Sequence, residues 1–185
     1  MKIIAVFVLI SLLLSGCTGQ QQMDSAMAFR QKMTEGAGCG FLCTVTADYG
    51  DKLYTFSMDC SFDNAGNMTF SVVKPESISG ITGTIGHDGG KLTFDDQALA
   101  FELLADGYIS PVSAPWFFVK TVRGGFIQSC SQDGTNTRIT FLDTFTEEAL
   151  QTDVWMDPVN MPLHCEILWQ GRRILSLEVS NFSYL

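Results

Sequence analysis

The side chains best suited to catalysis are few and poorly placed for it. The chain has two histidines, His87 in an Asp-Gly-Gly turn segment and His164 beside Cys165 in an alternating segment. A Ser–His or Cys–His nucleophile needs a third group to orient the histidine, and neither a Gly-x-Ser-x-Gly elbow nor another catalytic signature is present. The pairs Asp95-Asp96 and Glu147-Glu148 point to opposite faces or to solvent. We therefore expect no enzyme, with a hydrolase of unrecognised type as the weakest alternative.

The glycine-rich segment from Ser79 to Gly90 could suggest a phosphate-binding loop. It contains five glycines but lacks a Gly-Lys-Ser/Thr sequence, and it does not open a helix. Strand and turn glycines explain this segment better. The sequence therefore indicates no nucleotide and no other cofactor.

Cysteines offer a second kind of chemistry. Beyond the N-terminal region there are five: Cys39, Cys43, Cys60, Cys130 and Cys165. Cys39 and Cys43 cannot bridge on one strand, because four steps of about 3.3 Å exceed the Cα limit of about 7 Å. A register that pairs Val45 with Tyr54 sets Cys39 opposite Cys60, and we predict a Cys39–Cys60 disulfide. The spacing does not suit zinc, and we expect no metal.

The N-terminus has the pattern of an export signal. Met1 and Lys2 precede a twelve-residue apolar run, Ile3–Leu14, which is too short for a membrane-spanning helix of about 20 residues. Leu14-Ser15-Gly16-Cys17 follows and resembles the bacterial lipobox. That resemblance implies cleavage of a signal peptide, residues 1–16, and lipid attachment (diacylglycerol and palmitate-type chains) at Cys17, for stable membrane anchoring. An ordinary secretory signal that contains a cysteine is the alternative.

Composition limits the kind of partner. The 185 residues are 46% hydrophobic and 17% charged, with a formal net charge of −9. These values suit one globular domain, and a phosphate backbone would repel such a chain, so we expect no nucleic acid. No later apolar run approaches 18 residues. We expect an extracytoplasmic monomer on the outer leaflet of a Gram-positive cell membrane, with residues 17–23 as lipidated cysteine and short tether, and residues 24–185 as one domain.

The elements follow from periodicity. A helix is expected from Asp24 or Ser25 to about Thr34, and a second from Trp116 to about Arg123, stopped by two glycines. Between and after them, apolar residues alternate with Ser, Thr and Asp, which predicts strands with one apolar face. We count eleven strands in meander order. Two helices cannot cover the whole concave face of such a sheet, so it either closes on its own side chains or leaves an apolar hollow.

Two turns set the register. A two-residue turn at Tyr49-Gly50 would pair the first two strands with both apolar sets on one face. In the last hairpin we predict a three-residue turn, Gln170-Gly171-Arg172, because a two-residue turn would set apolar against polar positions.

The element order carries a family resemblance. Its features are the first helix, the three-strand meander, Pro75-Glu76-Ser77-Ile78-Ser79-Gly80, the Ser110-Pro111 helix and the ending Ser180-Asn181-Phe182. Together they resemble the LolA/LolB/LppX superfamily of lipoprotein-carrier and lipoprotein-localisation proteins, over about residues 24–185. Trp155-Met156-Asp157 followed by Pro162 is similar to LolA-like lipoproteins of Gram-positive anaerobes. The resemblance implies an α+β, mostly β fold: a curved eleven-stranded antiparallel half-barrel covered by two or more lid helices.

In that superfamily the hollow holds acyl chains, and the resemblance implies the same here. The candidate lining residues are Phe41, Val45, Tyr54, Phe56, Met58, Phe70, Val72, Phe94, Phe101, Val154, Ile167 and Leu177, with Trp116 and Phe117 on the lid. The expected function is that of a lipid or lipoprotein carrier or chaperone, which predicts an apolar cavity of roughly several hundred Å³. Because this chain keeps its own anchor, we do not expect it to shuttle freely between membranes.

The same alternation also fits an ordinary filled core. The alternative function is therefore a non-enzymatic regulatory or structural envelope lipoprotein that uses the fold to bind a protein partner. It predicts a filled core and an exposed apolar patch.

Overall fold

The computed structural model describes residues 18–95, 97–101, 104–105 and 108–185. The signal segment, the lipobox and Cys17 lie outside these residues. The helices are α2 (Thr18–Glu35) and α3 (Ala114–Gly124), with short 3-10 turns η2 (Glu76–Ile78) and η3 (Pro111–Ser113). The strands are β1 (Gly38–Asp48), β2 (Leu53–Asp63), β3 (Met68–Lys74), β4 (Thr82–Gly86), β5 (Gly89–Phe94), β6 (Gln97–Phe101), β7 (Leu104–Ala105), β8 (Tyr108–Ile109), β9 (Phe126–Asp133), β10 (Asn136–Leu142), β11 (Leu150–Met156), β12 (Pro162–Trp169) and β13 (Arg172–Tyr184).

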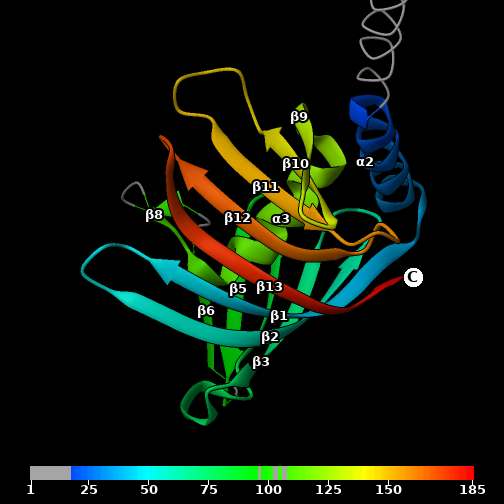
Figure 1. Cartoon of the computed structure of the whole chain (residues 1–185). Coiled ribbons are helices and arrows are strands. Elements are labelled where there is room, and N and C mark those ends of the chain that lie inside the picture. Colours follow the sequence, from blue (N-terminus) through cyan, green and yellow to red (C-terminus); the bar gives the residue numbers. More distant parts are fainter. Residues whose placement is uncertain (1–17, 96, 102–103, 106–107) are drawn as a thin grey trace, which may run out of the picture.

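One open antiparallel sheet dominates the described part of the chain (Figure 1). It has eleven strands in the order β6-β5-β4-β3-β2-β1-β13-β12-β11-β10-β9, and β7 and β8 form a separate two-stranded sheet. Two meanders, β1 to β6 and β9 to β13, therefore meet where the first strand pairs with the last. The fold is the one that the family resemblance implied: mostly β, open, and covered by two helices on one face.

The β1–β2 turn corrects a prediction. The loop contains four residues, with Asp48 opposite Leu53, in place of the two-residue turn predicted at Tyr49-Gly50. The Asp48 carboxylate accepts a hydrogen bond from the backbone N–H of Gly50 (2.8 Å), and Gly50 adopts φ +89°, so a local Asx-type turn widens the loop. The register consequently moves by two residues, and Val45 lies opposite Phe56. Since the shift is even, both apolar sets still share one face.

The last hairpin reaches the predicted pairing by another route. Its turn has two residues, Gln170 and Gly171, and not the predicted three, because Trp169 pairs with Arg172. A bulge between Ile167 and Leu168 then restores the in-phase pairs Ile167–Leu175 and Cys165–Leu177, which the sequence predicted. The bulge supplies the extra residue that the predicted turn would have supplied.

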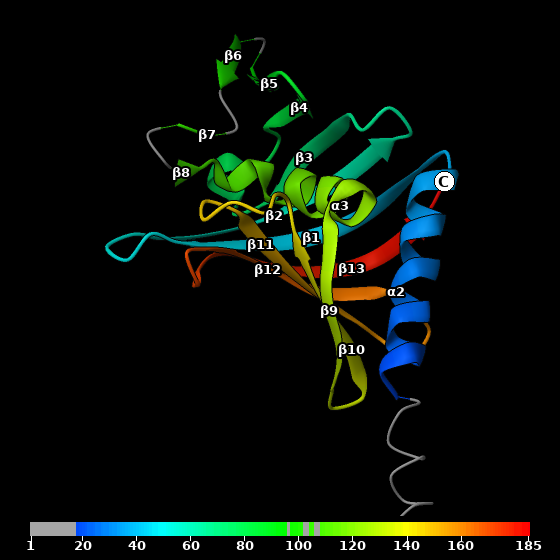
Figure 2. The same ribbon diagram turned by 90° about the horizontal axis from the view of Figure 1, so that it is seen from above.

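Both helices pack on the apolar face, which we call the inner face (Figure 2). Helix α3 matches its prediction within two residues at each end. Helix α2 begins earlier than expected: residues 18–23, predicted as a tether, form its first turns. Helix α2 contacts β9 and α3, while α3 contacts β10, β12 and β13. Among the described residues, neither helix combines the length and apolar character that crossing a membrane requires.

Candidate functional site

Most of the predicted lining residues lie in a filled core. Ten of them are at most 8% exposed: Phe41, Val45, Phe56, Met58, Phe70, Val72, Trp116, Val154, Ile167 and Leu177. Phe41 shows how they pack, with ring centroids 5.8 Å from both Phe62 and Phe118. Phe117 is partly buried against the same core. The side chain of Phe101 lies outside the described residues.

The inner face continues beyond the helices at the β4–β6 end of the sheet. Phe70 pairs with Gly83, Gly83 with Leu92, and Leu92 with Leu99, so these residues share the inner face. Leu92 is partly buried, but Phe94 is 52% and Leu99 is 65% exposed. We call Leu92, Phe94 and Leu99 the inner-face strip. Phe94 and Leu99 make it an exposed apolar surface next to the buried core.

Tyr54 is the other exposed member of the predicted set, at 47%. It lies near the β1–β2 loop, where its ring centroid is 6.4 Å from that of Tyr49. The Tyr49 hydroxyl donates to the carbonyl of Ile109, which joins this loop to the segment that precedes α3. Burial, with a smaller contribution from Tyr54, raises the pKa of Tyr49 to about 12. The phenol therefore remains neutral and able to donate throughout the physiological range.

A pocket of about 390 Å³ lies between α3 and the β2–β3 turn. We call it the α3 pocket. Its apolar lining residues are Phe62, Trp116 and Val119. Lys120, Arg123, His87 and residues 64–67 of the β2–β3 turn also line it. The Trp116 indole Nε1–H donates to the Gly66 carbonyl (3.0 Å), which fixes the ring. A pocket of this size lies within the range, about 300–1,000 Å³, that holds small ligands.

Two cations border this pocket. The Lys120 ammonium lies 4.9 Å from the centroid of Trp116 and 5.7 Å from that of Phe117. The Arg123 guanidinium donates to the carbonyls of Asp63 (3.2 Å) and Asn64 (2.7 Å). Neither cation was among the predicted site residues, although Trp116, Lys120 and Arg123 have the i, i+4, i+7 spacing that places side chains on one helix face.

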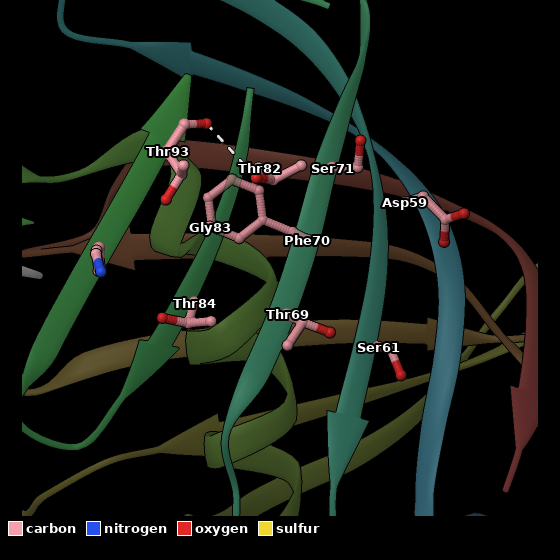
Figure 3. A pocket seen from close by; sticks show the side chains of 10 residues that line it. Asp59, Ser61, Thr69, Phe70, Ser71, Thr82, Gly83, Thr84 and Thr93 are labelled. Carbon is pink, nitrogen blue, oxygen red and sulfur yellow. Dashed lines mark hydrogen bonds between the residues drawn. The ribbon is translucent and has the colours of Figure 1, made fainter. Parts of the chain in front are cut away.

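The opposite, outer face is polar. A pocket of about 610 Å³ lies there over β2 to β5. Figure 3 shows the side chains that line it. Six of its ten lining residues carry a hydroxyl group, and the others are one acid, one base, Phe70 and Gly83: Ser61, Thr69, Ser71, Thr82, Thr84, Thr93, Asp59, Lys91, Phe70 and Gly83. The Phe70 ring lies against Gly83. The Thr82 hydroxyl donates to the Thr93 carbonyl (3.5 Å), a bond at the limit of useful length.

In the hydrogen bonds and ion pairs of the described residues, both histidines contact carboxylates and not a serine, threonine or cysteine side chain. His164 lies between Glu178 (Nδ1–Oε1 2.8 Å) and Glu166 (Nε2–Oε1 3.5 Å) on the outer face. Cys165 points to the inner core and is fully buried, because neighbouring residues of a strand face opposite ways. The described residues also contain no group of three or more His, Cys, Asp or Glu side chains that could hold a metal ion.

The predicted Cys39–Cys60 pairing is not present. With the register moved by two residues, Cys60 lies opposite Phe41, and Cys39 lies opposite Phe62. All five cysteines of the described residues are free thiols, and the Sγ atoms of Cys43 and Cys60 lie 3.9 Å apart without a covalent bond. Burial raises the pKa of Cys39 to about 12 despite the opposing effect of Arg123. The Cys39 thiol is therefore protonated and poorly reactive at neutral pH.

Comparison with known proteins gives remote likenesses. No family model and no curated protein matches the sequence. An uncharacterised conserved protein from Thermus thermophilus is 11% identical over 87% of this chain and 88% of its own, with a TM-score of 0.48. A putative outer membrane lipoprotein-sorting protein domain from Vibrio parahaemolyticus is 11% identical over 89% of this chain and 92% of its own, with a TM-score of 0.46. A LolA superfamily protein from Nitrosomonas europaea is 10% identical over 85% of this chain and 92% of its own, with a TM-score of 0.44. At these values the likenesses do not extend to function.

Proposed function

We propose that this protein is a membrane-anchored extracytoplasmic lipoprotein, without enzymatic activity, that binds the acyl chains of a lipid or lipoprotein on the inner face of its sheet. The observation that carries the proposal is the inner-face strip. Apolar side chains of the strip continue the covered core into open surface at the β4–β6 end. An acyl chain laid on this surface gains about 0.8 kcal/mol for each methylene that leaves water.

The packing of the buried core limits how an acyl chain could bind. Because the ten buried residues belong to one buried cluster that includes α3 side chains, an acyl chain that lay among them would have to displace α3. We propose that an acyl chain first lies on the inner-face strip. It then extends toward the α3 pocket, where Trp116 offers a second apolar surface. Movement of α3 would require release of the hydrogen bonds that hold it, from Trp116 to Gly66 and from Arg30 to Val122.

The anchor gives the site a direction. Cys17, the proposed lipid-attachment residue, directly precedes the first turn of α2. Strands β5 and β6 lie at the opposite side of the molecule from that turn in both views (Figures 1 and 2). The strip would then face away from the membrane that holds the protein, toward a donor or acceptor in the envelope.

A protein-binding role is the second candidate. The observation that favours it is the combination of a filled core with exposed apolar residues, which is the arrangement of an interaction surface. On that proposal the strip would receive apolar side chains of an envelope protein.

Native mass spectrometry of residues 18–185, which contain every helix and strand described, tests the choice. We expect adducts of lipid mass after expression or after incubation with phospholipid, and their loss on organic extraction. Leu99→Glu should lower uptake about tenfold or more, because a carboxylate on the strip would have to be desolvated. Leu53→Glu is the matched control, since Leu53 is 68% exposed and lies outside the strip.

Two results would overturn the proposal. A clean apo mass with no uptake of added lipid would contradict acyl binding and favour a protein partner. Equal loss of uptake in the Leu53 and Leu99 variants would show that the strip is not where the chain lies.

A further inference from the structure

We propose that the α3 pocket recognises a headgroup with net negative charge, so that the ligand is an anionic phospholipid and not a neutral or zwitterionic lipid. The inference rests on the proposed function and specifies its substrate class. It starts from charge: the lining of the pocket includes Lys120, Arg123 and His87 but no aspartate or glutamate. This is notable in a chain with 20 acidic and 11 basic residues. Each of four other pockets over the described residues includes an aspartate. Asp59 lines the outer-face pocket, and Asp157, Asp48 and Asp88 each line one of the other three.

Lys120 has no carboxylate within ion-pair distance among the described residues. Its contacts are with two aromatic faces, Trp116 and Phe117, which hold the ammonium over the pocket without neutralising it. An ammonium in that position retains its donors for an incoming anion. Lysine binds phosphate as a point charge, which tolerates headgroups of different shape.

Arg123 supplies the second donor. Its two hydrogen bonds go to carbonyl oxygens, those of Asp63 and Asn64, and not to a carboxylate. Carbonyls fix the guanidinium in place but leave its positive charge uncompensated, and a guanidinium has five N–H donors, more than these two bonds use. The nearby Asp63 carboxylate accepts from Asn67 (2.8 and 2.9 Å), which keeps it occupied within the β2–β3 turn. The Nδ1 atom of His87, which also lines the pocket, lies 3.4 Å from Oδ1 of Asp88.

The apolar floor makes the pocket suited to an amphiphile. Phe62, Trp116 and Val119 lie beside the two cations, so an anionic head and the first methylenes of a chain can be bound together. A headgroup without charge would gain less from the two cations, because charge-assisted hydrogen bonds to a phosphate are roughly twice as strong as neutral ones. A zwitterionic headgroup would also gain less, because the two cations repel its ammonium group.

The test compares lipids that share acyl chains and differ in headgroup. Residues 18–185 are incubated with vesicles of phosphatidylglycerol or of phosphatidylcholine, and bound lipid is counted by native mass spectrometry. We expect about tenfold higher uptake of phosphatidylglycerol, declining with added salt because the cations are exposed to solvent. Lys120→Gln should lower phosphatidylglycerol uptake more than phosphatidylcholine uptake, and so remove most of this preference. Lys91→Gln, an exposed lysine outside the pocket, should leave the preference intact.

The outcomes separate the two proposals. Equal uptake of both lipids would overturn the headgroup inference and leave acyl binding standing, whereas uptake of neither would overturn the proposed function itself. If glycerophosphate or inorganic phosphate at millimolar concentration binds as tightly as phosphatidylglycerol, the site is one for free phosphate and the lipid assignment is wrong. An unchanged preference in both Lys120→Gln and Arg123→Gln would show that the α3 pocket is not the headgroup site.

Discussion

Gly83 illustrates how one residue shapes the inner face. A Cβ placed there would lie 2.5 Å from Cζ of Phe70 and 2.6 Å from the carbonyl oxygen of Lys91. Phe70 therefore covers the position that a side chain of β4 would occupy. Because Gly83 has no side chain, the Phe70 ring can lie over β4. The buried core ends at this ring, and the inner-face strip begins next to it.

We predict that Gly83→Ala lowers the free energy of unfolding by about 1–3 kcal/mol, because the Phe70 ring must leave its position or the strand must shift. Urea denaturation measures the change. Gly19→Ala is the matched control, since Gly19 lies in α2 and a Cβ added there would have no atom within 4 Å, so alanine should be neutral or slightly stabilising. Equal stability of the Gly83 variant and the native chain would contradict this account of the Phe70 contact.

At the scale of elements, Arg30 joins the two helices. From α2 it donates to the carbonyls of Val122 (2.8 Å) and Gly125 at the C-terminal end of α3. A cation at this end also complements the helix dipole. Its guanidinium lies 5.4 Å from the ring centroid of Phe141, and burial lowers its pKa from the ordinary value. The lid is therefore one unit in which α2 holds the end of α3.

We expect Arg30→Met to lower the free energy of unfolding by about 1–3 kcal/mol, since two part-buried carbonyls lose a charged donor. Amide hydrogen exchange in residues 114–124 should accelerate more than exchange in β1. Lys32→Met on the same helix serves as control, because Lys32 is exposed and its ammonium lies over the Tyr184 ring, 5.6 Å from the centroid and away from α3. Equal effects of the two substitutions on α3 exchange would refute the joining role of Arg30.

At the scale of the whole molecule, the pairing of β1 with β13 makes one sheet from two meanders. Val45 pairs with Leu177, and Leu177 pairs in turn with Cys165 of β12. Leu177 is fully buried at this seam. Loss of packing at the seam should therefore reach both halves of the sheet, although they are distant in sequence.

We predict that Leu177→Ala costs about 2–5 kcal/mol of stability. Hydrogen exchange followed by mass spectrometry should show lower protection in β2 and β3 as well as in β11 and β12. Leu185→Ala, at an exposed C-terminal residue, should change stability by less than about 0.5 kcal/mol. If protection fell only in β9 to β13, the two meanders would unfold independently and the seam would not couple them.

The sequence by itself determined what depends on neighbours along the chain. Alternation assigned Phe41, Val45 and Met58 to one face, and the Ser-Pro and Gly-Gly segments bounded α3 within two residues, because period and capping are local properties. The same is true of the one-sided sheet. The β1–β2 register differs from the predicted one, but by an even number of residues, so these side chains stay on their predicted face. The export signal and Cys17 depend on sequence alone and remain predictions.

Only the tertiary structure decided which inner-face residues are covered. Phe56 and Phe94 have the same alternation, yet Phe56 is 8% exposed in the core and Phe94 is 52% exposed. The α3 pocket likewise joins a helix to a turn some 50 residues earlier, through the Trp116–Gly66 hydrogen bond. The bulge at Ile167 and the pairing of β1 with β13 were also decided only by the tertiary structure. Contacts between segments distant in sequence fix these features, because burial depends on what the rest of the chain places over a face, and local periodicity does not contain that information.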